Sequence, residues 1–191
     1  HQFSWKVLGA VLNQTGRVSD SLTSMQKSVD LAPHDAEAHS NLGVALQELG
    51  RLDEAMACYS QAILLAPGHA EAHNNLGVTL RELGKLEEAV ASYSQAIALK
   101  PAYADAHYNL GNTLQELGRL DEAVASYNHA IALKPAYAEA HNNLGNTLKQ
   151  LGRLDEAMAR YSQAIALKTD YTEAHLNLGI AIKNLKFNSS N

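Results

Sequence analysis

The chain has 191 residues and a mass of 20.6 kDa, which suits one ordinary domain or one short repeat array. Apolar residues make up 46% and the net charge is only −5, so the composition excludes an intrinsically disordered chain and gives no support to a basic nucleic-acid-binding face. The single cysteine, Cys58, excludes an intrachain disulfide framework and a thiolate metal cluster.

No apolar run comes near the roughly 18 residues that a membrane-spanning helix needs. No signal peptide is visible, and the chain starts at His1 rather than at a methionine, which is typical of an excised fragment. We expect a cytoplasmic protein without a membrane span.

The sequence repeats itself every 34 residues, because the tripeptide Asn-Leu-Gly recurs at 41–43, 75–77, 109–111, 143–145 and 177–179. The period predicts a single array over 1–191. Its repeats are 2–35, 36–69, 70–103, 104–137 and 138–171, followed by a partial repeat or capping helix at 172–187 and a tail at 188–191.

The first half of each repeat has the apolar spacing of a helix. In 36–69, the stripe Ala38, Leu42, Ala45 and Leu49 has spacings of 4, 3 and 4 residues, which places it on one helical face. Gly43 lies beside the stripe, where a missing side chain permits a close helix approach. Gly50 then predicts a helix end in the left-handed conformation.

The second half predicts a second helix. Asp53 and Glu54 open it, where acidic side chains favour the positive end of the helix dipole. Its apolar stripe ends before Pro67, which cannot continue a helix. A two-helix hairpin cannot bury two apolar faces alone, so neighbouring repeats must stack. The sequence therefore predicts an all-α solenoid of about eleven helices.

The residues that carry this pattern are Leu42-Gly43, Ala55, Tyr59, Ala62 and Pro67, together with Trp5, Leu8-Gly9, Gly16 and Pro33 in the first repeat. This pattern resembles the tetratricopeptide repeat. The resemblance implies a right-handed superhelix that binds proteins, with the first helix of every repeat lining a concave groove. The segment 136–148 is also similar to the repeats of O-linked N-acetylglucosamine transferases and of bacterial proteins that join such repeats to glycosyl- or sulfotransferase domains.

An asparagine recurs at one position of successive first helices and should form a ladder along the groove: Asn41, Asn75, Asn109, Asn143 and Asn177. Asparagine is a poor interior helix residue, so propensity does not explain its recurrence. A side-chain amide offers both a donor and an acceptor and could bind an extended peptide backbone. The resemblance to the transferases implies the same use. Alternatively, the amides tie each repeat to the next, and both roles can hold together.

Neighbouring positions should supply selectivity in the groove. They are Asn74, Tyr108 and Asn142 beside the ladder and Asn112 and Asn146 one turn later. Near the C-terminus the corresponding residues are Leu176 and Ile180, which predict either an apolar pocket or a surface that a further half-repeat covers.

Acidic residues recur in the first turn of the first helices, at Glu37, Glu71, Asp105, Glu139 and Glu173. They suit the helix dipole and make the groove rim acidic, which favours neutral or basic partners. The carboxylate clamp of chaperone-binding relatives would map to Lys6, Ala10, Asn41, Glu71 and Asn75. Only Lys6 and Asn41 match it, so we reject a clamp.

No residue set predicts catalysis, a metal site or a cofactor. The repeated His39, His73, His107, His141 and His175 are too far apart for one metal ion and are predicted to pack. Three functional hypotheses remain. They are a protein-interaction scaffold, a substrate-selecting arm of a larger transferase, and a scaffold that associates with itself. No nucleic-acid partner is expected.

Overall fold

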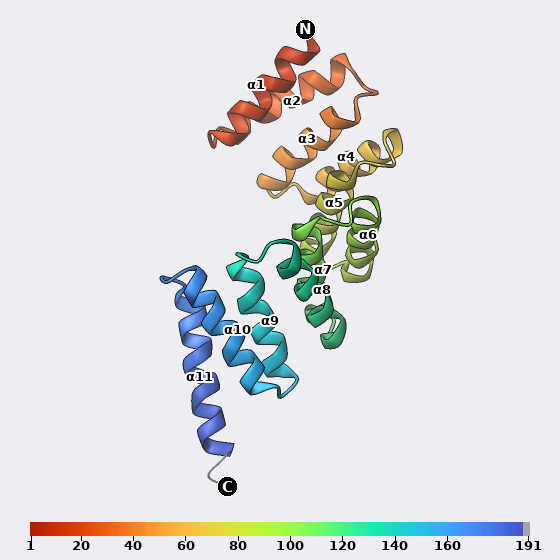
Figure 1. Cartoon of the computed structure of the whole chain (residues 1–191). Helices are drawn as coiled ribbons and strands as arrows, with labels where there is room; N and C mark the ends of the chain where they lie inside the picture. Colours follow the sequence, from red (N-terminus) through yellow and green to blue (C-terminus); the bar gives the residue numbers. More distant parts are fainter. Residues whose placement is uncertain (189–191) are drawn as a thin grey trace. The chain divides into compact units, whose positions relative to one another are not determined.

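A computed structural model describes residues 1–188, and this part of the chain forms eleven helices and no strand. The helices, labelled in Figure 1, are α1 Gln2–Gln14, α2 Val18–Leu31, α3 Ala36–Glu48, α4 Leu52–Leu65, α5 Ala70–Glu82, α6 Leu86–Leu99, α7 Ala104–Glu116, α8 Leu120–Leu133, α9 Ala138–Gln150, α10 Leu154–Leu167 and α11 Thr172–Asn188. The all-α solenoid expected from the sequence is confirmed. No described helix combines the length and the apolar character that crossing a membrane requires.

The helix ends follow the local signals in the sequence. Gly50, expected to stop α3, has a φ of 71°, a left-handed conformation that glycine adopts without strain. Residues 66–69 link α4 to α5, and Pro67 lies in this loop as expected. Each odd-numbered helix begins at the first residue of a 34-residue repeat. The last residue of α11 is Asn188, and 189–191 of the expected tail lie outside the described residues.

The two helices of a hairpin approach closely at a glycine. A Cβ atom added to Gly43 would lie only 2.7 Å from Cε1 of Tyr59, whose side chain is fully buried. The same contact joins Gly111 to Tyr127. The predicted role of Gly43 is therefore confirmed, because only a hydrogen atom leaves space for the tyrosine ring.

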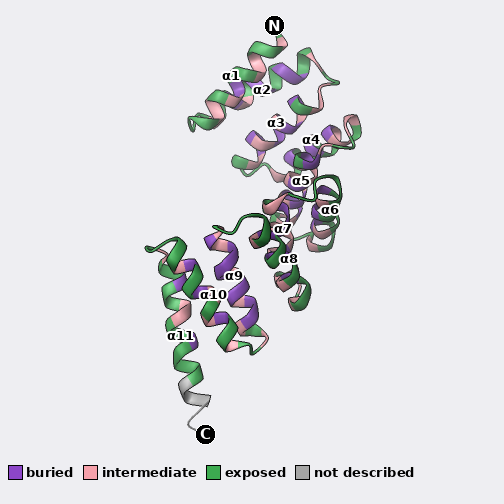
Figure 2. Ribbon diagram, viewed as in Figure 1, coloured by how far each residue is buried: buried purple, intermediate pink, exposed green. Residues whose placement is uncertain are grey.

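The helices group into two compact units by their contacts. Unit 1 spans His1–Pro101 and contains α1 to α6, and unit 2 spans Ala102–Asn191 and contains α7 to α11. Within each unit the two helices of a hairpin pack together, and each hairpin packs on the next. In unit 2, α9 contacts α7, α8, α10 and α11 and is buried along much of its length, whereas α11 is largely exposed (Figure 2).

First and second helices differ in how they meet their counterparts in the next repeat. Cα atoms of α1 and α3, of α3 and α5, of α7 and α9, and of α9 and α11 come within 8 Å of each other. Within residues 1–101 there is no such approach between α2 and α4 or between α4 and α6. Each unit therefore curves with its first helices on the inner side. We call the side lined by the first helices the inner surface and the opposite side the outer surface.

Candidate functional site

The asparagine ladder lies on the first helices, with Asn41 on α3 and Asn75 on α5 in unit 1, and with Asn109, Asn143 and Asn177 on α7, α9 and α11 in unit 2. All five side chains are half-buried. A half-buried amide keeps some access to a ligand, and hydrogen bonds within the protein decide how much of its donor and acceptor capacity is left.

In unit 1 the ladder amides keep free capacity. Asn75 Oδ1 accepts a hydrogen bond of 3.3 Å from Asn74 Nδ2, but Asn75 Nδ2 donates to no atom of residues 1–188. The Asn41 side chain makes no hydrogen bond to any part of the chain that the structure describes. Both amides therefore keep hydrogen-bonding capacity that no described residue uses.

A cavity of about 380 Å³ opens beside Asn75 at the ladder. It is smaller than the cavity of about 580 Å³ that lies elsewhere in unit 1. Val44 and Val78 form the apolar part of the cavity beside Asn75, and its other residues are Gln47, Glu48, Tyr59 and Glu82. Gln47 Nε2 donates to Glu82 Oε1 at 3.3 Å, and Asn13 Nδ2 donates to Glu48 Oε1 at 2.9 Å. Neither glutamate forms an ion pair within residues 1–188, so the cavity carries net negative charge.

In unit 2 hydrogen bonds within the protein occupy the ladder amides. Asn143 Nδ2 donates to Tyr108 Oη at 3.1 Å and to Asn112 Oδ1 at 2.9 Å. Asn177 Nδ2 donates to Asn142 Oδ1 at 3.1 Å. These bonds join successive repeats, as expected if the ladder ties the array together.

Part of the difference between the units lies one helical turn from the ladder. Unit 1 has Val44 and Val78 at this position, whereas unit 2 has Asn112 and Asn146. Asn112 Oδ1 accepts from Tyr127 Oη at 2.8 Å as well as from Asn143, and a valine can do neither. In unit 1 the Tyr59 hydroxyl donates to Gln47 Oε1 at 3.1 Å, and Tyr127 also donates to the equivalent Gln115 Oε1 at 3.0 Å.

The polar residues expected to give selectivity are buried or half-buried. Asn74 and Asn142 are buried, and Asn142 Nδ2 donates to Glu173 Oε1 at 3.0 Å. Tyr108 is half-buried and packs against Tyr137, with ring centroids 4.8 Å apart and the ring planes tilted by 34°. Asn146 is half-buried and accepts a hydrogen bond of 2.9 Å from Tyr161 Oη. Burial raises the pKa of this tyrosine to about 12, so its hydroxyl stays protonated and can donate.

The apolar residues expected at the C-terminal end of the groove are exposed on α11. Leu176 is 62% exposed and Ile180 is 41% exposed. A second apolar position, which the sequence analysis missed, lies on α1, where Val7 occupies the ladder register and is 45% exposed. The 34-residue period was the signal that could have found it, because Val7 precedes Asn41 by one repeat.

The repeated histidines connect the first helices to the preceding loops. His39 Nε2 lies 3.0 Å from the Pro33 carbonyl oxygen, and His73, His141 and His175 make the corresponding contacts. Burial lowers the pKa of His141, which favours its neutral form. Each ring therefore holds a loop against its helix, in agreement with the packing role that the sequence predicted.

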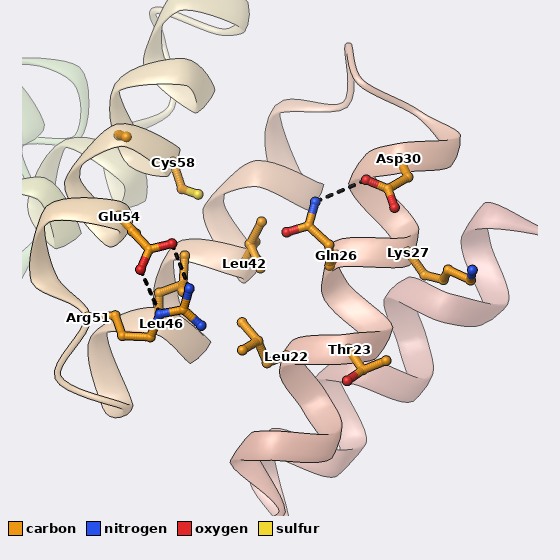
Figure 3. A pocket seen from close by; sticks show the side chains of 11 residues that line it. Leu22, Thr23, Gln26, Lys27, Asp30, Leu42, Leu46, Arg51, Glu54 and Cys58 are labelled. Atoms are coloured by element: carbon orange, nitrogen blue, oxygen red, sulfur yellow. Dashed lines mark hydrogen bonds and ion pairs between the residues drawn. The ribbon is translucent and has the colours of Figure 1, made fainter.

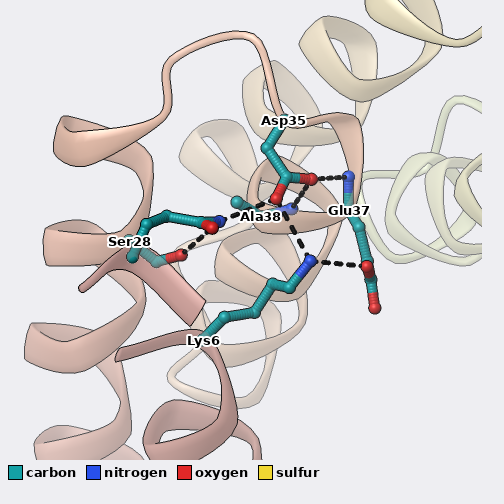
Figure 4. A network of polar contacts seen from close by, with 6 residues as sticks. Lys6, Ser28, Asp35, Glu37 and Ala38 are labelled. Atoms are coloured by element: carbon teal, nitrogen blue, oxygen red, sulfur yellow. Dashed lines mark hydrogen bonds and ion pairs between the residues drawn. The ribbon is translucent and has the colours of Figure 1, made fainter. Parts of the chain in front are cut away.

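Lys6 is held by acidic side chains (Figure 4). Its Nζ lies 3.1 Å from Asp35 Oδ2 and 2.6 Å from Glu37 Oε2. The hydrogen bond to Glu37 and the one to Asp35 raise the pKa of Lys6 against the opposing effect of burial. This lysine is therefore occupied within the protein, which supports the rejection of a carboxylate clamp. On the same rim, Lys100 neutralises Glu71 at 2.7 Å.

The larger cavity, of about 580 Å³, lies on the outer surface of unit 1 between α2 and α4, with α3 beneath (Figure 3). The sequence analysis missed it, although Lys27 and Asp30 depart from the Gln61 and Leu64 found one repeat later. Cys58 lines this cavity, and burial raises the pKa of its thiol.

Family models of the tetratricopeptide repeat match residues 36–69 and 58–91, and a third model, described as TPR repeat, matches 79–118, 115–152 and 145–186. The search of curated proteins finds no match.

Among solved structures, MamA is 25% identical with a TM-score of 0.77, covering 84% of this chain and 94% of its own. The thermophilic TPR protein TTC0263 of Thermus thermophilus is 26% identical with a TM-score of 0.73, covering 95% of this chain and 99% of its own. YrrB, a TPR protein with an unusual peptide-binding site, is 21% identical with a TM-score of 0.74, covering 91% of this chain and 90% of its own.

Proposed function

The chain belongs to the tetratricopeptide repeat family, and from this premise we propose that it is a non-enzymatic adaptor that binds an extended peptide or protein segment on its inner surface. The observation that carries the proposal is the cavity at Asn75, where an amide with a free donor lies beside two valines. The cytoplasmic location expected from the sequence is part of the proposal.

The chemistry of this cavity fits a peptide with an apolar or a basic side chain. An amide can donate to a peptide carbonyl oxygen and accept from a peptide N–H, so it binds the backbone without reading the side chains. Val44 and Val78 offer apolar surface to one side chain of the ligand. Glu48 and Glu82 favour a basic residue next to it and disfavour an acidic one.

The rigid scaffold also favours binding. Because the ladder residues lie on helices that pack against their neighbours, binding orders few protein side chains, and this lowers the entropic cost of association. YrrB has the same fold and a peptide-binding site, which supports a peptide as the ligand without identifying it.

A peptide-display selection tests the proposal. The library is selected on the parent chain and on the double variant Asn41→Ala/Asn75→Ala, with Asn128→Ala on the exposed face of α8 as a matched control. Enriched peptides should bind the double variant about tenfold more weakly or worse, because several hydrogen bonds to the backbone are lost. They should bind the control variant as they bind the parent.

Circular dichroism melts establish that each variant is folded. Enrichment of the same peptides with equal affinity on the parent and on the folded double variant would refute the ladder as the binding surface. Turnover of a glycosyl donor by the purified chain would refute the non-enzymatic part of the proposal.

A further inference from the structure

The outer surface of unit 1 carries a second binding surface, the outer cavity defined above. Leu42 and Leu46 are buried at its base, and Leu22 and Cys58 are half-buried at its sides (Figure 3). The cavity exists because α2 and α4 do not approach each other, which leaves the side of α3 between them uncovered. It lies apart from the ladder, whose residues are on the inner surface.

The polar residues at the rim of the cavity differ between its two sides. On the α4 side, Arg51 closes a bidentate pair with Glu54, with Nε to Oε1 at 2.7 Å and Nη2 to Oε2 at 2.6 Å. On the α2 side, Gln26 Nε2 donates to Asp30 Oδ1 at 3.0 Å. Lys27 and Asp30 form no ion pair with any residue of 1–188. An apolar centre with a polar rim is the anatomy of a protein interface.

The two charged rim residues without an ion pair within residues 1–188, Lys27 and Asp30, occur at the outer cavity and not at the equivalent positions of the next repeat. One repeat later, the residues equivalent to Lys27, Asp30 and Cys58 are Gln61, Leu64 and Ser92, none of which is charged. Stacking of the repeats does not require these charges, because the next repeat stacks without them. Their presence at one groove only is what a binding role predicts.

We propose that the outer cavity binds an amphipathic segment of a partner protein. The segment inserts apolar side chains between α2 and α4 and places an acidic residue near Lys27 and a basic residue near Asp30. Lys27 and Asp30 are three residues apart on α2, so the two partner charges lie about one helical turn apart. A volume of about 580 Å³ holds several apolar side chains, and the cavity is open on its solvent side. This opening suits side chains that project from a backbone outside the cavity better than an enclosed small molecule.

The test begins with a library of amphipathic peptides selected on the whole chain. Ala57→Trp fills the cavity, and Ala91→Trp places the same ring one repeat later on α6 as the matched control. Both alanines are exposed, so both variants should fold, and circular dichroism verifies this. Enriched peptides should lose about tenfold or more in affinity for Ala57→Trp and keep their affinity for Ala91→Trp.

The single cysteine provides a direct readout of occupancy. Cys58 lines the cavity, so the rate at which N-ethylmaleimide alkylates it should fall about fivefold or more when a selected peptide saturates the chain.

The charge at the rim is tested by reversal. Lys27→Glu should lower the affinity of peptides that carry an acidic residue about three- to tenfold, and exchange of that residue for lysine should restore binding.

Several outcomes would overturn the proposal. If the selected peptides bind Ala57→Trp as tightly as the parent and leave the alkylation rate of Cys58 unchanged, they bind elsewhere on the chain. If the Asn41→Ala/Asn75→Ala variant loses them, the function proposed for the inner surface stands while this inference fails. Protection of Cys58 by an apolar dye such as anilinonaphthalene sulfonate, with none by any peptide, would identify a small-molecule cavity instead. Protection that rises with protein concentration alone would identify a second copy of the chain as the occupant.

Discussion

The inner surfaces of unit 1 and unit 2 carry the same ladder of asparagines but use its amides differently. In unit 1, Asn75 lies beside valines and keeps its Nδ2 donor free of the described chain, whereas in unit 2 Asn143 donates to both Tyr108 and Asn112. A residue that recurs in every repeat therefore does not have one role. Its role depends on what the neighbouring repeats place beside it.

The same comparison shows what is common to the units. Tyr59 in unit 1 and Tyr127 in unit 2 are both fully buried against a glycine of the preceding helix. The contact between glycine and tyrosine is thus alike in the two units, whereas the polar contacts on the inner surface differ. Three predictions test this division, in order of decreasing effect on stability.

Removal of a buried tyrosine should have the largest effect. Tyr59→Ala and Tyr127→Ala should each lower the free energy of unfolding by about 3–5 kcal/mol, the range for deleting a large buried ring. Because stability in a repeat array comes mainly from neighbouring interfaces, the loss should concentrate in the unit that carries the substitution. Amide hydrogen exchange measured helix by helix checks this. Equal loss of protection in both units would show that the array opens as one cooperative body.

An exchange of the residue one helical turn from the ladder should give the ladder amides of one unit the hydrogen bonding seen in the other unit. Asn112→Val removes the acceptor of two hydrogen bonds and should cost about 1–3 kcal/mol, at about 0.5–1.5 kcal/mol for each bond. It should also release part of the Asn143 donor capacity and increase peptide binding in unit 2. Urea denaturation and binding titrations measure the two effects.

The reverse exchange is the matched control. Val44→Asn introduces an amide beside Asn75 and Tyr59 and should tie the Asn75 donor within the protein. Peptide affinity should then fall while stability is kept or rises. An unchanged affinity in both variants would mean that the residue beside the ladder does not decide which amides bind.

The smallest effect is expected at the start of α3. The Asp35 carboxylate accepts from the backbone N–H groups of Glu37 and Ala38, whereas Tyr103, the residue before α7 in unit 2, gives no side-chain cap. Asp35→Ala should cost about 0.5–2 kcal/mol, the usual range for loss of a helix cap. Protection of the backbone amides from hydrogen exchange should weaken in unit 1 and not in unit 2.

The contribution of Asp35 to the free energy of unfolding should also depend on pH. Burial acts to raise the pKa of this carboxyl, but hydrogen bonds from Lys6, from the Ala38 N–H and from Gln2 outweigh it and hold the pKa below the ordinary value of 3.8. Since the folded protein has the lower pKa, the stabilisation is complete above the unfolded pKa and is lost as the pH falls through the folded pKa. An acid titration of the parent should show this loss, and Asp35→Ala should not.

Much of the fold could be predicted because the signals that set it are local. The 34-residue period, the glycine at a positive φ and the spacing of the apolar stripes all act within one hairpin. The contact of Gly43 with Tyr59 could be expected in kind, because a glycine beside an apolar stripe permits a close approach. The ladder could be placed on the first helices for the same reason.

The candidate sites could be predicted only in part. The sequence placed Asn75 and Asn143 at equivalent positions but could not say which amide is free, since the partners of Asn143 lie 31 and 35 residues away along the chain. The sequence also did not predict the outer cavity, because its walls come from different repeats.

The sequence by itself determined the period, the helix ends and the residues that face each other within a hairpin, because helix geometry and turn chemistry depend on neighbours along the chain. The tertiary structure alone decided which asparagines keep a free donor and where the second helices leave α3 uncovered. These features depend on the distance between side chains of adjacent repeats, and a difference of an ångström there makes or breaks a hydrogen bond.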